Sequence, residues 1–203
     1  MTPHLPELPF ELRPFGPEAD WTYENGTLTG RAGARQDRFV PPGGEALDSV
    51  SDAPRLLGTA PRGDFQLLAR VEVDFGAAFD AGVLYLHVGE REWAKICLEL
   101  SPDLPTVCTV VTRGQSDDVN SFVVDGNSCW LRLSRTGDAF AFHASADGEK
   151  WTFVRVFALG EPERAAEASV GFLVQSPTGE GCEASFDRIA FRATGLEDLR
   201  DGS

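Results

Sequence analysis

Short runs in which apolar and polar residues alternate make up most of the chain between Trp21 and Phe191. Successive side chains of an extended strand point to opposite sides, so this period of two predicts strands with one buried face. Residues such as Asn-Gly at 25–26 and Asp-Gly at 147–148 separate the runs and are typical of hairpin turns. The predicted strands are residues 27–32, 64–75, 82–89, 93–100, 106–113, 121–126, 129–136, 139–146, 152–159, 169–176 and 182–193.

About a dozen short strands without a long amphipathic helix predict an all-β protein, either a two-sheet sandwich or a closed barrel. The segment PPGGEALDSVSDAP (41–54) is predicted to be a surface loop, and EPERAAEA (161–168) one or two helical turns in a connection. We expect a single domain over residues 1–194. The polar stretch that follows, 195–203, is expected to be a flexible tail.

The stretch EWAKICLEL (92–100) has two sides of different character. One side is apolar and predicts contact with the core: Ala94, Ile96, Leu98 and Leu100. The other side carries Trp93, Lys95, Cys97 and Glu99. Lys95 and Glu99 are about 13 Å apart along a strand, too far for a direct ion pair. Each therefore needs a partner on another strand or in a ligand.

Other strands have similar polar sides. Their candidate ligand-binding residues are Tyr85, His87, Arg132 and His143. Two interpretations of the combined set remain open: a cross-strand network on a solvated sheet face, or a ligand surface. In the second, Trp93 and Tyr85 stack on a ligand, and Lys95 and Arg132 contact its oxygens or an acid group. Glu99, His87 and His143 then exchange hydrogen bonds with it.

The charge balance limits the classes of partner. The 203 residues carry a formal net charge of -14, which argues against nucleic acid, since phosphate binding needs a basic surface. The N-terminal residues lack the basic start and the apolar run of about seven residues of a signal peptide, and no stretch has the length of a membrane span. We therefore expect a cytoplasmic protein that binds no membrane. Its four cysteines show no metal-site spacing and are interpreted as reduced, mostly buried thiols.

An ordered set of motifs resembles a domain-of-unknown-function family linked by name to regulation of enolase, within the concanavalin A-like lectin/glucanase superfamily. The motifs are Asp37-x-Phe39, SDAP (51–54), GDF (63–65), FDAG (79–82), WAK (93–95), Glu99, VVT (110–112), SD (116–117), LRL (131–133), Arg135 and SADGEKW (145–151). The resemblance covers residues from about 21 to 191. It implies a jelly roll of two antiparallel sheets, one of them concave, and a shared Trp-x-Lys and Glu at Trp93, Lys95 and Glu99. The family pattern has an aromatic residue after Ser116-Asp117, where this chain has Asp118.

Three more specific motifs or sites have less support in the sequence: a glucanase signature, a sialidase Asp-box and a metal site. EVDF (72–75) begins like a glucanase signature, but Gly76-Ala77 follows and the second catalytic Glu is missing, so Glu72 and Asp74 are predicted to face solvent. SADGEKW resembles a sialidase Asp-box and predicts a structural turn. A metal shared by His87 and His143 has no third ligand identifiable from spacing, and Asp117-Asp118 could equally hold calcium in a loop.

The hypotheses for function belong to three classes. The leading one is a non-catalytic protein that binds a carbohydrate or small polar metabolite on its concave sheet. The second is an interaction protein that regulates a metabolic enzyme, as the family's name implies. The third is a hydrolase or isomerase that uses Glu99 with His87 or His143. No nucleotide-binding motif is present, and no cofactor is expected.

Overall fold

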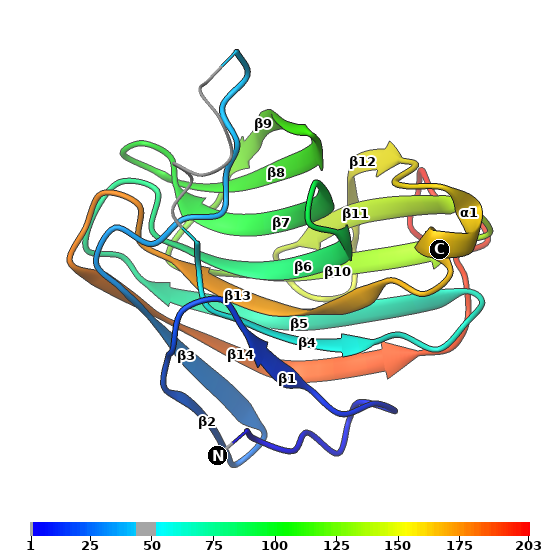
Figure 1. Cartoon of the computed structure of the whole chain (residues 1–203), viewed down its shortest axis with the longest axis horizontal. Coiled ribbons are helices and arrows are strands. Elements are labelled where there is room, and N and C mark those ends of the chain that lie inside the picture. Colours follow the sequence, from blue (N-terminus) through cyan, green and yellow to red (C-terminus); the bar gives the residue numbers. More distant parts are fainter. Residues whose placement is uncertain (1, 44–51) are drawn as a thin grey trace.

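The computed structural model describes residues 2–43 and 52–203 and contains two seven-stranded antiparallel sheets that pack face to face (Figure 1). Sheet A has the order β1 (Arg13–Phe15), β4 (Arg55–Thr59), β13 (Ser169–Gln175), β6 (Ala81–Gly89), β7 (Glu92–Leu100), β8 (Pro105–Arg113) and β9 (Gln115–Val123). Sheet B has the order β12 (Thr152–Phe157), β11 (Ala139–Ser145), β10 (Ser128–Thr136), β5 (Phe65–Asp74), β14 (Gly181–Arg192), β3 (Thr27–Gly33) and β2 (Trp21–Glu24). The predicted all-β sandwich is confirmed.

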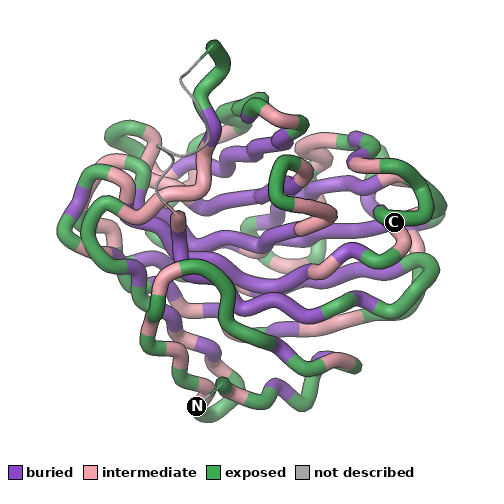
Figure 2. The backbone as a smooth tube through the Cα atoms, in the orientation of Figure 1, coloured by how far each residue is buried: buried purple, intermediate pink, exposed green. Residues whose placement is uncertain are grey.

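One side of each sheet forms the shared core. On β7 the inward side chains are Ala94, Ile96 and Leu98, as the alternation predicted, and all three are fully buried. From sheet B, residues such as Leu131 and Phe142 meet them. The central strands are buried along most of their length, while the loops and outer strands are exposed (Figure 2). This core fixes which side chains of each strand point outward.

Several element boundaries differ from the prediction. The short strands β1, β2 and β4 were not among the predicted strands, and β9 begins at Gln115, six residues before the predicted start at 121. Asp117 and Asp118 therefore lie on a strand. The helical turn α1 (Pro162–Ala165) lies within the predicted 161–168. Of the loop predicted over 41–54, residues 44–51 lie outside the described residues.

The SADGEKW motif is a structural turn, as predicted. The Asp147 carboxylate accepts backbone N–H bonds from Glu149 and Lys150, both at 2.8 Å. The Ser145 hydroxyl accepts a bond from the N–H of Gly148 at 2.9 Å. Gly148 has φ +77°, a conformation that favours glycine. These bonds close the hairpin that follows β11.

Residues 195–203, expected to be a flexible tail, lie against the outer face of sheet B. The Arg132 guanidinium donates a 2.7 Å bond to the carbonyl of Gly202 and lies 4.3 Å from the centre of the Trp151 ring. His143 Nε2 is 2.8 Å from the carbonyl oxygen of Leu199. The tail therefore has defined contacts with the sheet.

Two further sequence-based interpretations concern the cysteines and membrane-spanning segments. All four cysteines are free and buried, as predicted. Within residues 2–43 and 52–203, the structure has no helix with the length and apolar character needed to cross a bilayer.

Candidate functional site

The outer face of sheet A is covered by a second apolar layer. Its buried side chains come from the central strands and from the segment that crosses them, and include Val40, Val83, Tyr85, Trp93, Cys97, Cys108, Val110 and Leu173. Phe39 packs against this cluster. The face expected to be an open concave groove is therefore largely filled.

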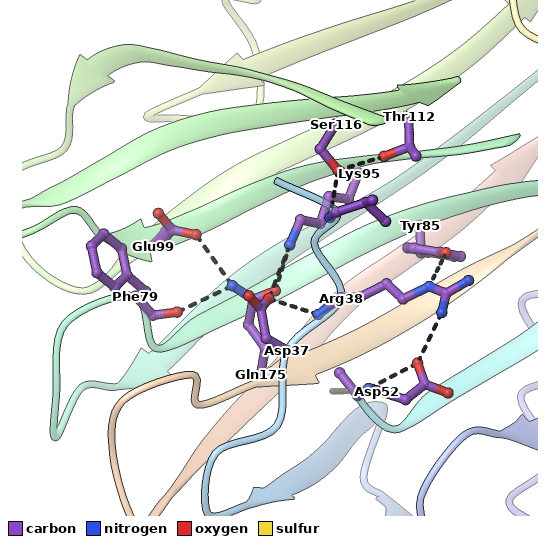
Figure 3. Close-up of polar contacts among 12 residues, drawn as sticks. Asp37, Arg38, Asp52, Phe79, Tyr85, Lys95, Glu99, Thr112, Ser116 and Gln175 are labelled. Carbon is purple, nitrogen blue, oxygen red and sulfur yellow. Dashed lines mark hydrogen bonds and ion pairs between the residues drawn. The ribbon is translucent and has the colours of Figure 1, made fainter. Parts of the chain in front are cut away.

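Residues 37–40, the crossing segment, form the cover (Figure 3). The N–H of Val40 donates to Ser116 Oγ at 2.9 Å, and its carbonyl accepts the Ser116 N–H at 2.8 Å. Arg38 lies 5.4 Å from the centre of the Trp93 ring and donates to the carbonyl of Glu90 at 3.1 Å. These contacts hold the segment across β6 to β9.

A chain of hydrogen bonds beneath the crossing segment links Lys95 to Glu99 (Figure 3). Lys95 Nζ donates to Gln175 Oε1 at 2.7 Å and lies 3.6 Å from Asp37 Oδ1. The Gln175 amide donates to the carbonyl of Phe79 at 3.2 Å and to Glu99 Oε2 at 3.3 Å. Gln175 thus supplies the partner that Lys95 and Glu99 need, because they are too far apart to pair directly.

The register of three strands explains how Gln175 reaches both groups. Ala81 on β6 is paired with Gln175 on β13 and with Glu99 on β7. Because alanine has a short side chain, the amide of Gln175 extends over β6 without obstruction. A small residue on the middle strand thus allows a polar contact between strands that are not hydrogen-bonded to each other.

These groups line a pocket of about 230 Å³, referred to below as the Lys95 pocket. Its lining residues are Asp37, Phe39, Phe79, Lys95, Glu99, Val110, Asp118, Gln175 and Pro177. They come from the crossing segment, β7, β8, β9, β13 and the connections before β6 and after β13. The pocket therefore combines buried polar groups with apolar walls, the usual composition of a small-molecule site.

Burial controls the ionisation of the Lys95 pocket. It raises the pKa of Glu99 to about 7, an effect that Lys95 opposes and Asp118 strengthens. Burial also raises the pKa of Asp118. Burial alone lowers the pKa of Lys95, but the Asp37 carboxylate and other neighbours outweigh it, so this pKa is raised and the ammonium stays charged. A carboxyl group with a pKa near neutrality in a pocket is typical of functional sites.

The sequence-predicted residues Tyr85, Trp93 and His87 share the outer face of sheet A with the pocket but do not line it. Tyr85 and Trp93 stack at 5.7 Å and are fully buried, so neither ring is free to stack on a ligand in this arrangement. His87 is paired with Trp93, six residues from Glu99, which places it about 20 Å away along the strands. Of the seven predicted residues, only Lys95 and Glu99 lie in the pocket.

Arg132 and His143 lie on sheet B, beneath residues 195–203. They were expected beside Lys95, but they occupy the opposite side of the sandwich. Burial, followed by the charge of Arg132, lowers the pKa of His143 to about 4, so the imidazole is neutral at physiological pH. Both side chains contact the C-terminal residues.

The sequence interpretation omitted three polar residues of the pocket from the candidate site: Asp37, Asp118 and Gln175. Gln175 gave a signal, because it is a polar residue that follows Leu173 on the outward side of a mostly apolar strand. Asp37 was noted only as part of a motif. Its position over the sheet depends on the path of a long connection, which periodicity does not predict.

The residues considered for other chemistries have the following surroundings. Among the described residues, no group of three or more His, Cys, Asp or Glu side chains has an arrangement that holds a metal ion. Glu72 and Asp74 are exposed on the outer face of sheet B, as expected for the solvent side of β5. Burial raises the pKa of Cys97 well above its ordinary value, so this residue remains a thiol.

A second depression, of about 570 Å³, lies at the β6–β7 turn and is lined by Glu90, Arg91, Glu92, Arg113, Gly114 and Arg164. Here Arg164 forms a 2.6 Å ion pair with Glu92 at the surface. Exposed ion pairs of this kind contribute little to stability, and their side chains are neither buried nor held in one orientation. The Lys95 pocket is therefore the stronger candidate for a binding site.

Comparison with known proteins gives a family match and a set of related folds. The family described as "Protein of unknown function (DUF1349)" matches residues 15–194. The chain is 25% identical over 152 residues to "Regulation of enolase protein 1" of Saccharomyces cerevisiae, covering 74% of this chain and 75% of that protein.

Solved structures show the same sandwich. A functionally unknown protein from Saccharomyces cerevisiae has a TM-score of 0.75 at 18% identity, over 91% of this chain and 97% of that one. The GH43 BlXynB protein from Bacillus licheniformis has a TM-score of 0.65 at 13% identity, over 86% of this chain and 34% of that one. At these identities the likeness shows the fold alone.

Replacing Lys95 with Met should destabilise the protein by about 1 to 3 kcal/mol, because Gln175 Oε1 loses its buried donor. The side chain of Asp37 is 25% exposed, so it can be hydrated, which keeps the loss below the roughly 3 to 5 kcal/mol of a fully buried pair. Urea unfolding measures the change. In a double-mutant cycle with Gln175→Leu, we expect a non-additive result; additive losses would contradict the coupling.

Replacing Glu99 with Gln should remove a pH dependence of stability. The native pKa of about 7 lies above the unfolded value near 4.5, so the native state binds the proton more tightly. Wild-type stability should therefore fall between about pH 4.5 and pH 7, by roughly 3 kcal/mol in total. Glu99→Gln should equal wild type near pH 4, below the unfolded pKa, and exceed it at pH 8. Unfolding curves of both proteins at the two pH values, with the exposed Glu72→Gln as the matched control, provide the test; parallel pH profiles would contradict it.

Proposed function

The chain belongs to the family described as "Protein of unknown function (DUF1349)", and on that premise we propose that it binds a small hydroxylated metabolite in the Lys95 pocket without transforming it. The observation that carries this proposal is the buried hydrogen-bond chain from Lys95 through Gln175 to Glu99 at the wall of the pocket. The side chains of Lys95 and Gln175 are almost completely buried, yet they border a space of about 230 Å³.

The size and composition of the pocket support a ligand no larger than a monosaccharide. Pockets for drug-sized ligands enclose roughly 300 to 1,000 Å³, so this one holds a smaller molecule. Carboxyl oxygens of Glu99 and Asp118 can accept hydroxyl hydrogen bonds, while Phe39 and Phe79 contribute apolar surface. A compact molecule with several hydroxyl groups matches this combination.

Catalysis by Glu99 together with a histidine is disfavoured by the surroundings of Glu99. An acid–base mechanism needs a second group close to the reacting atoms. His87 lies about 20 Å along the strands, and His143 is on the other sheet. Gln175 is a neutral amide that does not exchange protons. Glu99 therefore lacks the histidine partner that a hydrolase or isomerase of the kind considered above would use.

A second candidate is an interaction protein that regulates a metabolic enzyme, and two observations favour it. The yeast relative is named for regulation of enolase. Exposed apolar side chains, Leu104, Val119 and Val123, lie on or beside the edge strand β9. An edge strand with apolar side chains is a common contact surface for another protein.

The binding proposal predicts a thermal shift from neutral hexoses, pentoses or sugar alcohols. A ligand at 100 times its dissociation constant adds about 2.7 kcal/mol to the stability of the folded state. We expect Glu99→Gln and Lys95→Met to lose this shift relative to their own ligand-free forms, whereas Glu72→Gln retains it. No shift from any compound, or an equal shift in all variants, would refute binding in the Lys95 pocket.

The regulatory candidate predicts a complex with a metabolic enzyme, and enolase is the first to test. Sedimentation velocity with purified enolase, together with assays of enolase activity, would detect it. Val123→Asp places a charge on the exposed part of β9 and should abolish the complex, while Glu99→Gln should leave it intact. Absence of both a complex and an activity change would exclude enolase as the partner.

A further inference from the structure

The charges around the Lys95 pocket are unequal. Three carboxyl groups line it, those of Asp37, Glu99 and Asp118, against one ammonium, that of Lys95. The other lining residues carry no charge. With all four groups ionised the site has an excess of two negative charges, so an anionic ligand is repelled and a cationic one attracted.

Lys95 is not free to receive an acidic group. Its ammonium donates to Gln175 Oε1 at 2.7 Å and faces Asp37 Oδ1 at 3.6 Å. Its side chain is only 2% exposed. A ligand carboxylate would have to compete with these partners and would also approach Glu99 and Asp118. This differs from the role expected from the sequence, in which Lys95 contacts an acid group.

The aromatic residues in the wall of the pocket also favour a positively charged ligand. Phe39 and Phe79 both line the pocket, and the faces of aromatic rings attract cations electrostatically. A metal ion is a poor candidate, because no three His, Cys, Asp or Glu side chains among the described residues have a metal-binding arrangement. The two observations together favour an organic cation.

We propose that the Lys95 pocket selects a small hydroxylated molecule carrying a protonated amine, and that it rejects the corresponding acid. This inference rests on the proposed function and specifies its ligand class. The amine donates hydrogen bonds to Glu99 and Asp118 and faces the rings of Phe39 and Phe79, and the hydroxylated part of the molecule fills the rest of the pocket.

Binding of such a ligand depends on the ionisation of Glu99. The charged and titratable groups near Glu99 are Lys95 and Cys97 on β7, Cys108 on β8, Asp118 on β9 and Asp37 of the crossing segment. The thiols stay neutral, because burial raises the pKa of both cysteines. A bound ammonium favours the ionised form of Glu99, so affinity should rise from pH 6 to pH 8 as Glu99 loses its proton.

The test uses three open-chain six-carbon probes that differ in charge: D-glucamine, D-sorbitol and D-gluconate. Calorimetric titrations at pH 8 should give glucamine roughly ten-fold or more tighter binding than sorbitol, as expected for a hydrogen bond to a charged group, and no binding of gluconate. The advantage of glucamine should shrink at pH 6. It should disappear in Glu99→Gln and persist in Glu72→Gln, the matched substitution on the opposite face.

Other outcomes overturn the inference. Equal affinities for the three probes, or a preference for gluconate, would refute selection of a cation while leaving the proposed function standing. If glucamine binds equally to Glu99→Gln, the attraction comes from the overall charge of -14 and the inference is wrong. If none of the three probes binds, the inference is also wrong, and the screen of neutral sugars independently decides the proposed function.

Discussion

The buried ammonium of Lys95 is the interaction around which the outer face of sheet A is organised. A charge that is removed from water must be compensated by hydrogen bonds and an opposite charge. Three parts of the chain meet this need. Gln175 comes from β13 and Asp37 from the crossing segment, and both contact the ammonium directly. Glu99 lies on β7, the strand of Lys95, and acts through Gln175. The pocket exists because these partners converge on a face that is otherwise apolar.

The alternation of residues predicted the faces of the central strands correctly, but it could not assign them to sheets. A period of two tells which side chains share one side of a strand, and both sheets of a sandwich have an outward side. Lys95 and Arg132 are each on the outward side of a strand. They lie on opposite faces of the molecule because β7 belongs to sheet A and β10 to sheet B. That assignment depends on strand order, which requires contacts distant in sequence.

The burial of Tyr85 and Trp93 was unpredictable for a different reason. Aromatic side chains on the polar side of a strand are consistent with a ligand platform, and the strand alone does not tell what covers them. Here Arg38 lies over the Trp93 ring and Arg55 over the Tyr85 ring, both supplied by segments outside the central strands. Predicting this would require the path of the connection between β3 and β4. By contrast, Lys95 and Glu99 belong to one strand, so their shared face could be predicted without knowing the strand order.

The polar groups of the pocket are not the arrangement that stability alone would favour. Apolar residues of similar size at Lys95, Glu99 and Gln175 would fill the layer formed by Val83, Cys97 and Leu173 and would avoid the cost of burying charges. Glu99 has its pKa raised to about 7, which means that its ionised form is disfavoured where it stands. Energetically unfavourable groups of this kind, in a fold whose packing and polar contacts are otherwise favourable, are concentrated at functional sites. The likeness to GH43 structures, at 13% identity, shows the fold and no chemistry. We therefore propose the groups that surround Lys95 as the first place to test for function.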